Sequence, residues 1–110
     1  INDIHNKGLN KDIMIVVTGE FGRTYKINAN AGRDHWPKLS PLMISGGDFD
    51  MGYTVGASTS KAEEPKTDPV NPQNLTATLL KHFGVDQHTQ RLDMGGRPRY
   101  FVDVGTKSIL

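Results

Sequence analysis

The chain contains no cysteine, which excludes disulfide bonds, thiolate metal sites and a cysteine nucleophile. It also lacks any apolar run long enough to cross a membrane. Its charges nearly balance, with 13 Lys and Arg residues against 12 Asp and Glu residues and a formal net charge of +1. A nucleic-acid-binding surface needs an excess of basic residues. We therefore expect neither a nucleic acid nor a membrane as a partner.

Core-forming residues are also scarce. Hydrophobic residues make up 35% of the 110 residues and aromatic residues 7%, a length and composition that suit one small soluble domain. The chain begins with Ile1, and its first residues are typical of a helix end closed by Gly8. Because a domain rarely starts on the end of a helix, we expect the 110 residues to be part of a longer protein.

The order of apolar and polar segments predicts an α/β fold. Residues 13–17 (IMIVV) are continuous, apolar and rich in β-branched side chains, which favours a strand buried on both faces, as in a parallel sheet. Residues 41–45 (PLMIS) predict a second strand and residues 53–56 a short third one. The polar residues 57–69 are expected to form an exposed loop.

The clearest helix is predicted to begin after Asn71, which can cap it, with Pro72 at the first helical position and Gly84 beyond its end. Its apolar core face is predicted from residues spaced by four: Leu75, Leu79 and Phe83. Residues 85–98 read as irregular, and residues 99–104 predict a last edge strand.

Most of the chemistry lies between residues 19 and 36. The sequence GEFGRT directly follows the first strand, and in open α/β sheets ligands bind beyond the carboxyl ends of strands. Gly19 and Gly22 allow the backbone to approach a ligand closely. Glu20 offers a carboxylate, and Arg23 offers donors that suit a phosphate or sulfate. The alternative is a loop in which Glu20 and Arg23 form a structural ion pair.

The second cluster is GRDHW, residues 32–36. Asp34 and His35 can offer an oxygen and an imidazole nitrogen to a divalent metal ion, and Arg33 adds a second guanidinium. The alternative for His35 is a structural histidine bonded within its own loop, and Trp36 is expected to pack against the sheet. The remaining histidines are expected at the surface: His5, His82 and His88.

Taken together, GEFGRT, GRDHW, PLMISGG and GRPRYFVD at their spacing in this chain resemble the C-terminal part of the domain-of-unknown-function 1501 family. The resemblance covers nearly the whole chain. That family is similar to the alkaline phosphatase and sulfatase superfamily. The resemblance implies a partial alkaline-phosphatase-like sheet with flanking helices, in which residues 1–110 are the C-terminal portion of one domain. It also implies a secreted or periplasmic bacterial protein.

The superfamily implies a metal-dependent hydrolase of phosphate or sulfate esters, with Zn, Ca or Mn as the divalent ion. By this resemblance Glu20, Asp34 and His35 become candidate metal ligands. The superfamily commonly has an Asp-His pair where this chain has Glu20-Phe21. Phe21 cannot ligate a metal, so the strand end is a weaker source of ligands here.

The same resemblance makes Arg23 and Arg33 candidates for binding the ester oxyanion of a small anionic ester or a sulfated glycan. No residue is assigned as a catalytic nucleophile, so the chain alone is expected to be inactive and to need the remainder of its own domain.

Two alternatives stay open: an inactive protein of this fold that binds an anionic ligand, and a structural domain. The hydrolase requires Glu20, Asp34 and His35 to converge, whereas the structural domain requires Glu20 or Asp34 to pair with an arginine.

Overall fold

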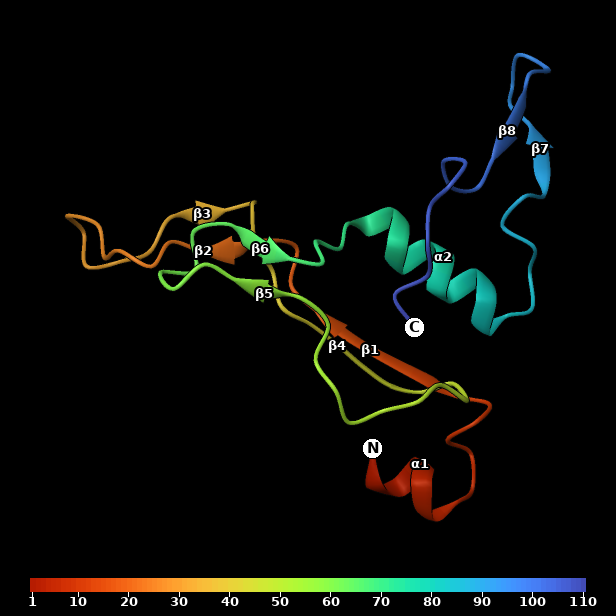
Figure 1. Ribbon diagram of the computed structural model, residues 1–110, viewed down its shortest axis with the longest axis horizontal. Coiled ribbons are helices and arrows are strands. Elements are labelled where there is room, and N and C mark those ends of the chain that lie inside the picture. Colours follow the sequence, from red (N-terminus) through yellow and green to blue (C-terminus); the bar gives the residue numbers. More distant parts are fainter. The chain divides into compact units, whose positions relative to one another are not determined.

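The computed structural model describes residues 1–110 and contains two compact units, Ile1–Pro69 and Val70–Leu110. The units hold two α-helices and eight short strands, and the strands pair into four two-stranded antiparallel sheets (Figure 1). Neither helix has the length and apolarity needed to cross a lipid bilayer.

The first unit opens with helix α1, Asn2–Asn6. The helix ends as the sequence predicts. Gly8 adopts a φ of +70°, and its N–H donates to the carbonyl of His5 at 3.0 Å. The N–H of Leu9 then donates to Ile4 at 3.0 Å. These bonds satisfy carbonyls that the end of a helix leaves without partners.

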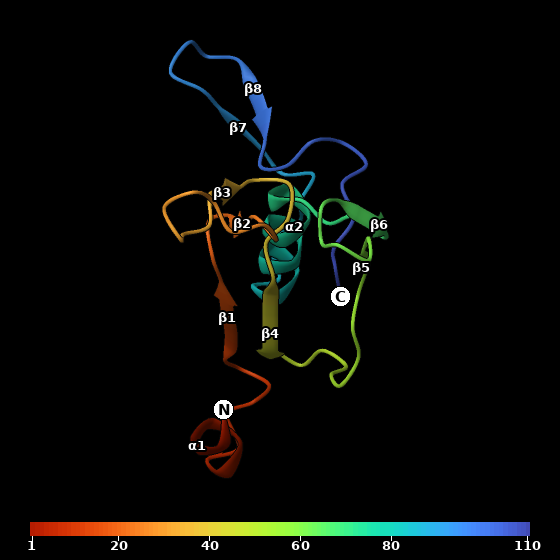
Figure 2. The ribbon, with the colours of Figure 1, turned by 90° about the vertical axis from the view of Figure 1, so that its left-hand side faces the viewer.

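Two five-residue strands form the central ribbon of the first unit, β1 (Met14–Thr18) and β4 (Leu42–Gly46). Both strands were predicted, and both are confirmed. The prediction of a parallel sheet is wrong. The two strands pair antiparallel, with Met14 opposite Gly46 and Thr18 opposite Leu42 (Figure 2). The residues between them fold into a nested hairpin that returns the chain to the end of β1, whereas parallel strands would need a crossover connection.

The predicted burial of β1 on both faces is also wrong for this chain. Val17 in β1 is 54% exposed and Met43 in β4 is 46% exposed. Neither α1 nor another sheet of the first unit forms a packed layer on the ribbon. The apolar side chains of β1 and β4 therefore keep much of their surface in contact with solvent.

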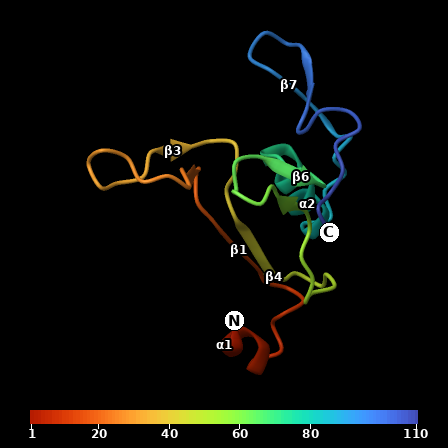
Figure 3. The ribbon, with the colours of Figure 1, turned by 60° about the vertical axis from the view of Figure 1, so that its left-hand side comes forward.

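The remaining strands of the first unit were not predicted, and two of them lie in residues 57–69, which were expected to form an exposed loop. β2 (Gly22–Arg23) pairs with β3 (His35–Trp36), and a long loop joins them (Figure 3). β5 (Ala57–Ser58) pairs with β6 (Pro65–Thr67). The third strand predicted at residues 53–56 does not form, and β5 begins just after it. Such two- and three-residue strands are too short to give a periodic sequence signal.

Helix α2, Pro72–His82, opens the second unit and confirms the predicted helix. The Asn71 side chain accepts hydrogen bonds from the backbone of Gln73 at 2.9 Å and Asn74 at 3.2 Å. The Asn74 side chain accepts from the Asn71 N–H at 2.9 Å, which completes a capping box. Gly84, with a φ of +65°, ends the helix as predicted.

The buried face of α2 differs from the predicted one. Phe83 is 70% exposed, and Leu75 and Leu79 are only half-buried. The buried residues of the helix are Ala77 and Thr78. The reason is that the C-terminal residues Ser108 and Ile109 form hydrogen bonds with Thr78 and so pack on the face of α2 that carries Ala77 and Thr78.

The second unit ends in β7 (Gln90–Leu92) and β8 (Pro98–Tyr100), which form an antiparallel hairpin. Residues 85–98 are therefore not irregular throughout, and the strand predicted at 99–104 is shorter and begins one residue earlier. Helices and strands are both present, as an α/β prediction requires. No larger sheet with helices on its faces is present among these residues.

Candidate functional site

Four of the five candidate site residues lie on the β2–β3 hairpin (Arg23, Arg33, Asp34 and His35), and Glu20 lies just before it. The strand register places Arg23 opposite His35 and Gly22 opposite Trp36. The Thr24 N–H extends this pairing by donating to the carbonyl of Asp34 at 3.0 Å. The motifs GEFGRT and GRDHW are thus neighbours because two short strands pair, and not because they share the edge of a parallel sheet.

Gly22 permits the close backbone approach that the sequence predicts, although the neighbour is the chain itself. A Cβ atom at Gly22 would lie 2.1 Å from the carbonyl oxygen of Leu39. Real Cβ atoms do not approach a backbone oxygen this closely, so only glycine fits without displacing the backbone.

Asn28 organises the turn of the hairpin, a role that the sequence prediction missed. Its side-chain oxygen accepts from the N–H groups of Asn30 and Gly32, both at 3.0 Å. Its amide nitrogen donates to a carboxylate oxygen of Asp34 at 2.8 Å. The available signal is the segment NANAG, since Asn favours turns in which its side chain accepts from the backbone two residues on.

The two arginines of the hairpin are held by carbonyl groups. One terminal nitrogen of Arg33 donates to Thr24 and to Tyr25, both at 2.6 Å. Arg23 donates to the carbonyl of Arg33 at 3.1 Å. Neither arginine takes part in an ion pair, so the ion pair considered between Glu20 and Arg23 does not form. Carbonyl groups fix the guanidinium positions but do not neutralise their charge.

The three candidate metal ligands do not form a metal site by themselves. Glu20 makes no ion pair or side-chain hydrogen bond, and Asp34 is bonded to Asn28. His35 lies against Phe21, with ring centroids 4.0 Å apart. No group of three or more His, Asp and Glu side chains in the structure is arranged to hold a metal ion. These residues alone therefore do not supply a complete set of ligands for the implied divalent ion.

The base of the hairpin is tied to the loop between β5 and β6. The Trp36 indole N–H donates to the carbonyl of Glu63 at 2.7 Å. Lys38 forms an ion pair with Glu64. The hydrogen bond that the Lys38 ammonium donates to the Glu64 carboxylate, together with the positive charge of Lys38, holds the pKa of the Glu64 carboxyl below its usual range. Trp36 is half-buried, so it serves as a packing and anchoring residue.

Comparison with protein families matches residues 1–110 to a family described as "Protein of unknown function (DUF1501)". No curated protein and no solved structure matches the chain. The family description names no activity, so the function has to be argued from the chemistry of the hairpin.

Proposed function

The chain belongs to the DUF1501 family, and from that premise we propose that it is the C-terminal segment of a phosphate or sulfate ester hydrolase, to which it contributes an oxyanion-binding hairpin. We also propose that the family is related to the alkaline phosphatase and sulfatase superfamily and that the protein is secreted or periplasmic.

The observation that carries the proposal is the state of Arg23 and Arg33. Both lie on one hairpin, both are exposed, and no carboxylate neutralises either of them. Each bonds to carbonyl groups through one terminal nitrogen, which leaves other N–H donors available. Planar guanidinium groups with free donors match the oxygens of a phosphate or sulfate.

The metal dependence of the hydrolase is part of the proposal, but it needs groups from outside these residues. Between them, the carboxylate of Glu20 and the imidazole of His35 provide groups that bind Zn²⁺, Ca²⁺ or Mn²⁺. Because Asp34 is bonded to Asn28, it is better suited to orienting His35 than to binding the ion directly. A divalent ion would stabilise the charge that develops on the ester oxygens.

Sulfate and phosphate binding tests the hairpin directly. In a titration of the 110-residue chain with either anion at constant ionic strength, followed by NMR, we expect saturable shifts at the backbone amides of Thr24 and Asp34. Replacing both Arg23 and Arg33 with Gln is expected to abolish saturation. The control Lys61→Gln/Lys66→Gln removes the same charge from two exposed residues of the β5–β6 hairpin and should leave the shifts unchanged. Equal shifts with chloride would contradict the proposal.

Hydrolysis provides the second test. The 110-residue chain should not turn over p-nitrophenyl phosphate or sulfate with added Zn²⁺, Ca²⁺ or Mn²⁺, since no group of ligands for a metal is assembled in it. Metal-dependent turnover that is lost in His35→Ala would show that the chain needs nothing else.

A second candidate is a protein of this family that binds an anionic ligand, such as a sulfated glycan, without catalysis. It is favoured because Glu20, Asp34 and His35 are not part of any group of three side chains that could hold a metal ion. Anion binding in the full-length protein, without ester hydrolysis at any divalent ion, would distinguish it from the hydrolase.

A further inference from the structure

The second unit carries a charged hairpin that the proposed function does not use. This β7–β8 hairpin (residues 90–101) pairs Arg91 with Arg99 and Leu92 with Pro98 across its two strands. Its turn is closed by the N–H of Asp93, which donates to the carbonyl of Arg97 at 2.9 Å.

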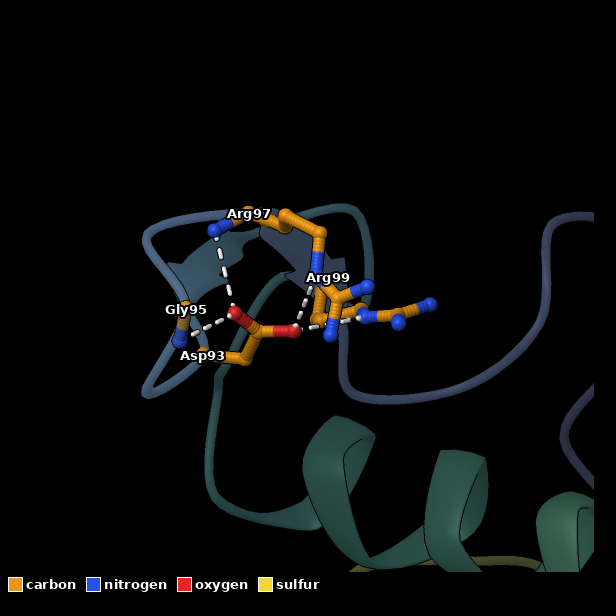
Figure 4. A network of polar contacts seen from close by, with 4 residues as sticks. All are labelled: Asp93, Gly95, Arg97 and Arg99. Carbon is orange, nitrogen blue, oxygen red and sulfur yellow. Dashed lines mark hydrogen bonds and ion pairs between the residues drawn. The ribbon is translucent and has the colours of Figure 1, made fainter.

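Asp93 organises the charged groups of this hairpin. One carboxylate oxygen accepts from the backbone N–H groups of Gly95 at 2.9 Å and Arg97 at 3.0 Å. The other accepts from Nε of Arg97 at 3.1 Å and of Arg99 at 3.3 Å (Figure 4). The Arg97 backbone N–H, followed by the Gly95 N–H and the two guanidinium groups, holds the pKa of the Asp93 carboxyl below its usual range. The carboxylate is therefore charged at neutral pH and keeps the two arginines side by side.

The outer ends of both arginines are available to a ligand. Arg97 and Arg99 bond to Asp93 only through Nε, so their terminal nitrogens make no hydrogen bond. Their side chains are 71% and 64% exposed. Arg91 lies directly opposite Arg99, and like charges in such a pair destabilise it. The hairpin thus carries an excess of two positive charges, with three guanidinium groups against one carboxylate, and an anion would relieve their repulsion.

The same hairpin also carries apolar side chains. Four of them are exposed: Leu92, Met94, Tyr100 and Phe101. The guanidinium of Arg91 lies 5.6 Å from the ring centroid of Phe101. The hairpin contains no Lys and no Glu. Protein interfaces are enriched in aromatic residues, Met and Arg and depleted in Lys and Glu. A small inorganic anion would leave these apolar side chains uncovered.

We propose that the β7–β8 hairpin docks a partner polypeptide through an acidic segment that also carries apolar side chains. Arg97 and Arg99 receive its carboxylates, since a guanidinium can bind a carboxylate through two parallel hydrogen bonds. Asp93 holds both arginines in place before binding, which lowers the side-chain entropy lost on association.

A labelled peptide of alternating Glu and Leu, titrated with the 110-residue chain and followed by fluorescence anisotropy, tests the proposal. Replacing Arg97 and Arg99 with Gln should weaken binding about tenfold or more. A peptide with Gln in place of Glu should bind as weakly. The control Lys61→Gln/Lys66→Gln removes the same charge and should change the Kd by less than about twofold. Equal weakening by the two double variants would overturn the proposal.

Asp93→Asn separates an organised arginine pair from simple charge attraction. It makes the chain more positive, so charge attraction alone predicts tighter binding. The proposal predicts binding about threefold weaker, because the arginines lose their anchor while the Asn oxygen can still accept from Gly95 and Arg97. Unchanged amide shifts in the turn verify that the hairpin stays folded. Tighter binding by Asp93→Asn, or binding to anionic phosphatidylserine vesicles without binding to the peptide, would refute the proposal.

Discussion

The Thr78 hydroxyl is the clearest place to test what holds the second unit together. Thr78 is fully buried. Its Oγ1 donates to the carbonyl of Asn74 at 2.8 Å and accepts from the N–H of Ile109 at 2.9 Å. Ser108 also donates toward it at 3.2 Å, but the Ser108 hydroxyl lies closer, at 2.6 Å, to the carbonyl of Leu110. The Ile109 N–H is therefore the group that would lose its acceptor if the Thr78 hydroxyl were removed.

Thr78→Val keeps the shape of the side chain and removes the hydroxyl. It leaves the N–H of Ile109 without its acceptor, which costs about 1–2 kcal/mol for a partly buried donor. A loss of that size lowers the protection of an amide against hydrogen exchange by a factor of about 5–30. We expect this loss at Ile109, measured by amide exchange of the 110-residue chain, and Thr78→Ser should restore the protection.

Thr76→Val is the matched control, since Thr76 lies on the same helix and its hydroxyl donates only to the carbonyl of Pro72, at 3.1 Å. That substitution removes a similar bond within the helix but none to the C-terminal segment, and it should change stability by no more than about 0.5 kcal/mol. Exchange at Ile109 that is unaffected by Thr78→Val, or affected equally by Thr76→Val, would refute the role given to Thr78.

Two further predictions concern the hairpins. Gly22→Ala should destabilise the β2–β3 hairpin by about 1–3 kcal/mol because its Cβ would lie 2.1 Å from the Leu39 carbonyl oxygen. Gly19→Ala should be tolerated, since the nearest neighbours of its Cβ would lie at 3.6 Å. Amide chemical shifts of the hairpin measure both effects, and unchanged shifts in Gly22→Ala or large changes in Gly19→Ala would contradict the prediction. The Asp93 carboxyl should titrate below its ordinary value of 3.8, so its contribution to stability is complete above that pH and is lost as the pH falls through the lower, folded-state pKa. The chemical shift of the Asp93 carboxyl carbon, followed against pH, measures this pKa. Arg97→Gln should raise the pKa of Asp93 only in part, because the backbone N–H of residue 97 remains. A full return of the pKa to 3.8 in that variant would contradict the prediction.

The local features of the fold could be predicted from the residues concerned. Asn71, Pro72 and Gly84 carry cap and boundary signals that act within one turn of a helix, and the structure confirms all three. The strands β1 and β4 follow from short runs of apolar and β-branched residues. These signals depend on backbone conformation and on neighbours in the sequence, so no distant contact is needed to interpret them.

The pairing and burial of those elements could not be predicted in the same way. The apolar run of β1 suits a strand buried on both faces, but Val17 is exposed because nothing in the first unit covers the ribbon. The spacing of Phe83 suits a core position, but the segment that packs on α2 contacts the face of Thr78 instead. Periodicity describes which side chains share a face, and it does not say what lies against that face.

For the candidate sites, the sequence by itself determined the chemistry and the tertiary structure decided its arrangement. Guanidinium, carboxylate and imidazole groups between residues 20 and 35 were evident from residue types and motif spacing. Only the structure showed that Arg23 and Arg33 bond to carbonyl groups, that Asp34 is bonded to Asn28, and that Glu20 forms no ion pair with either arginine. Only the structure showed the arginine pair held by Asp93. The physical reason is that a hydrogen bond forms only when donor and acceptor come within about 2.7–3.2 Å of each other, and residue types alone do not specify which groups the folded chain brings that close.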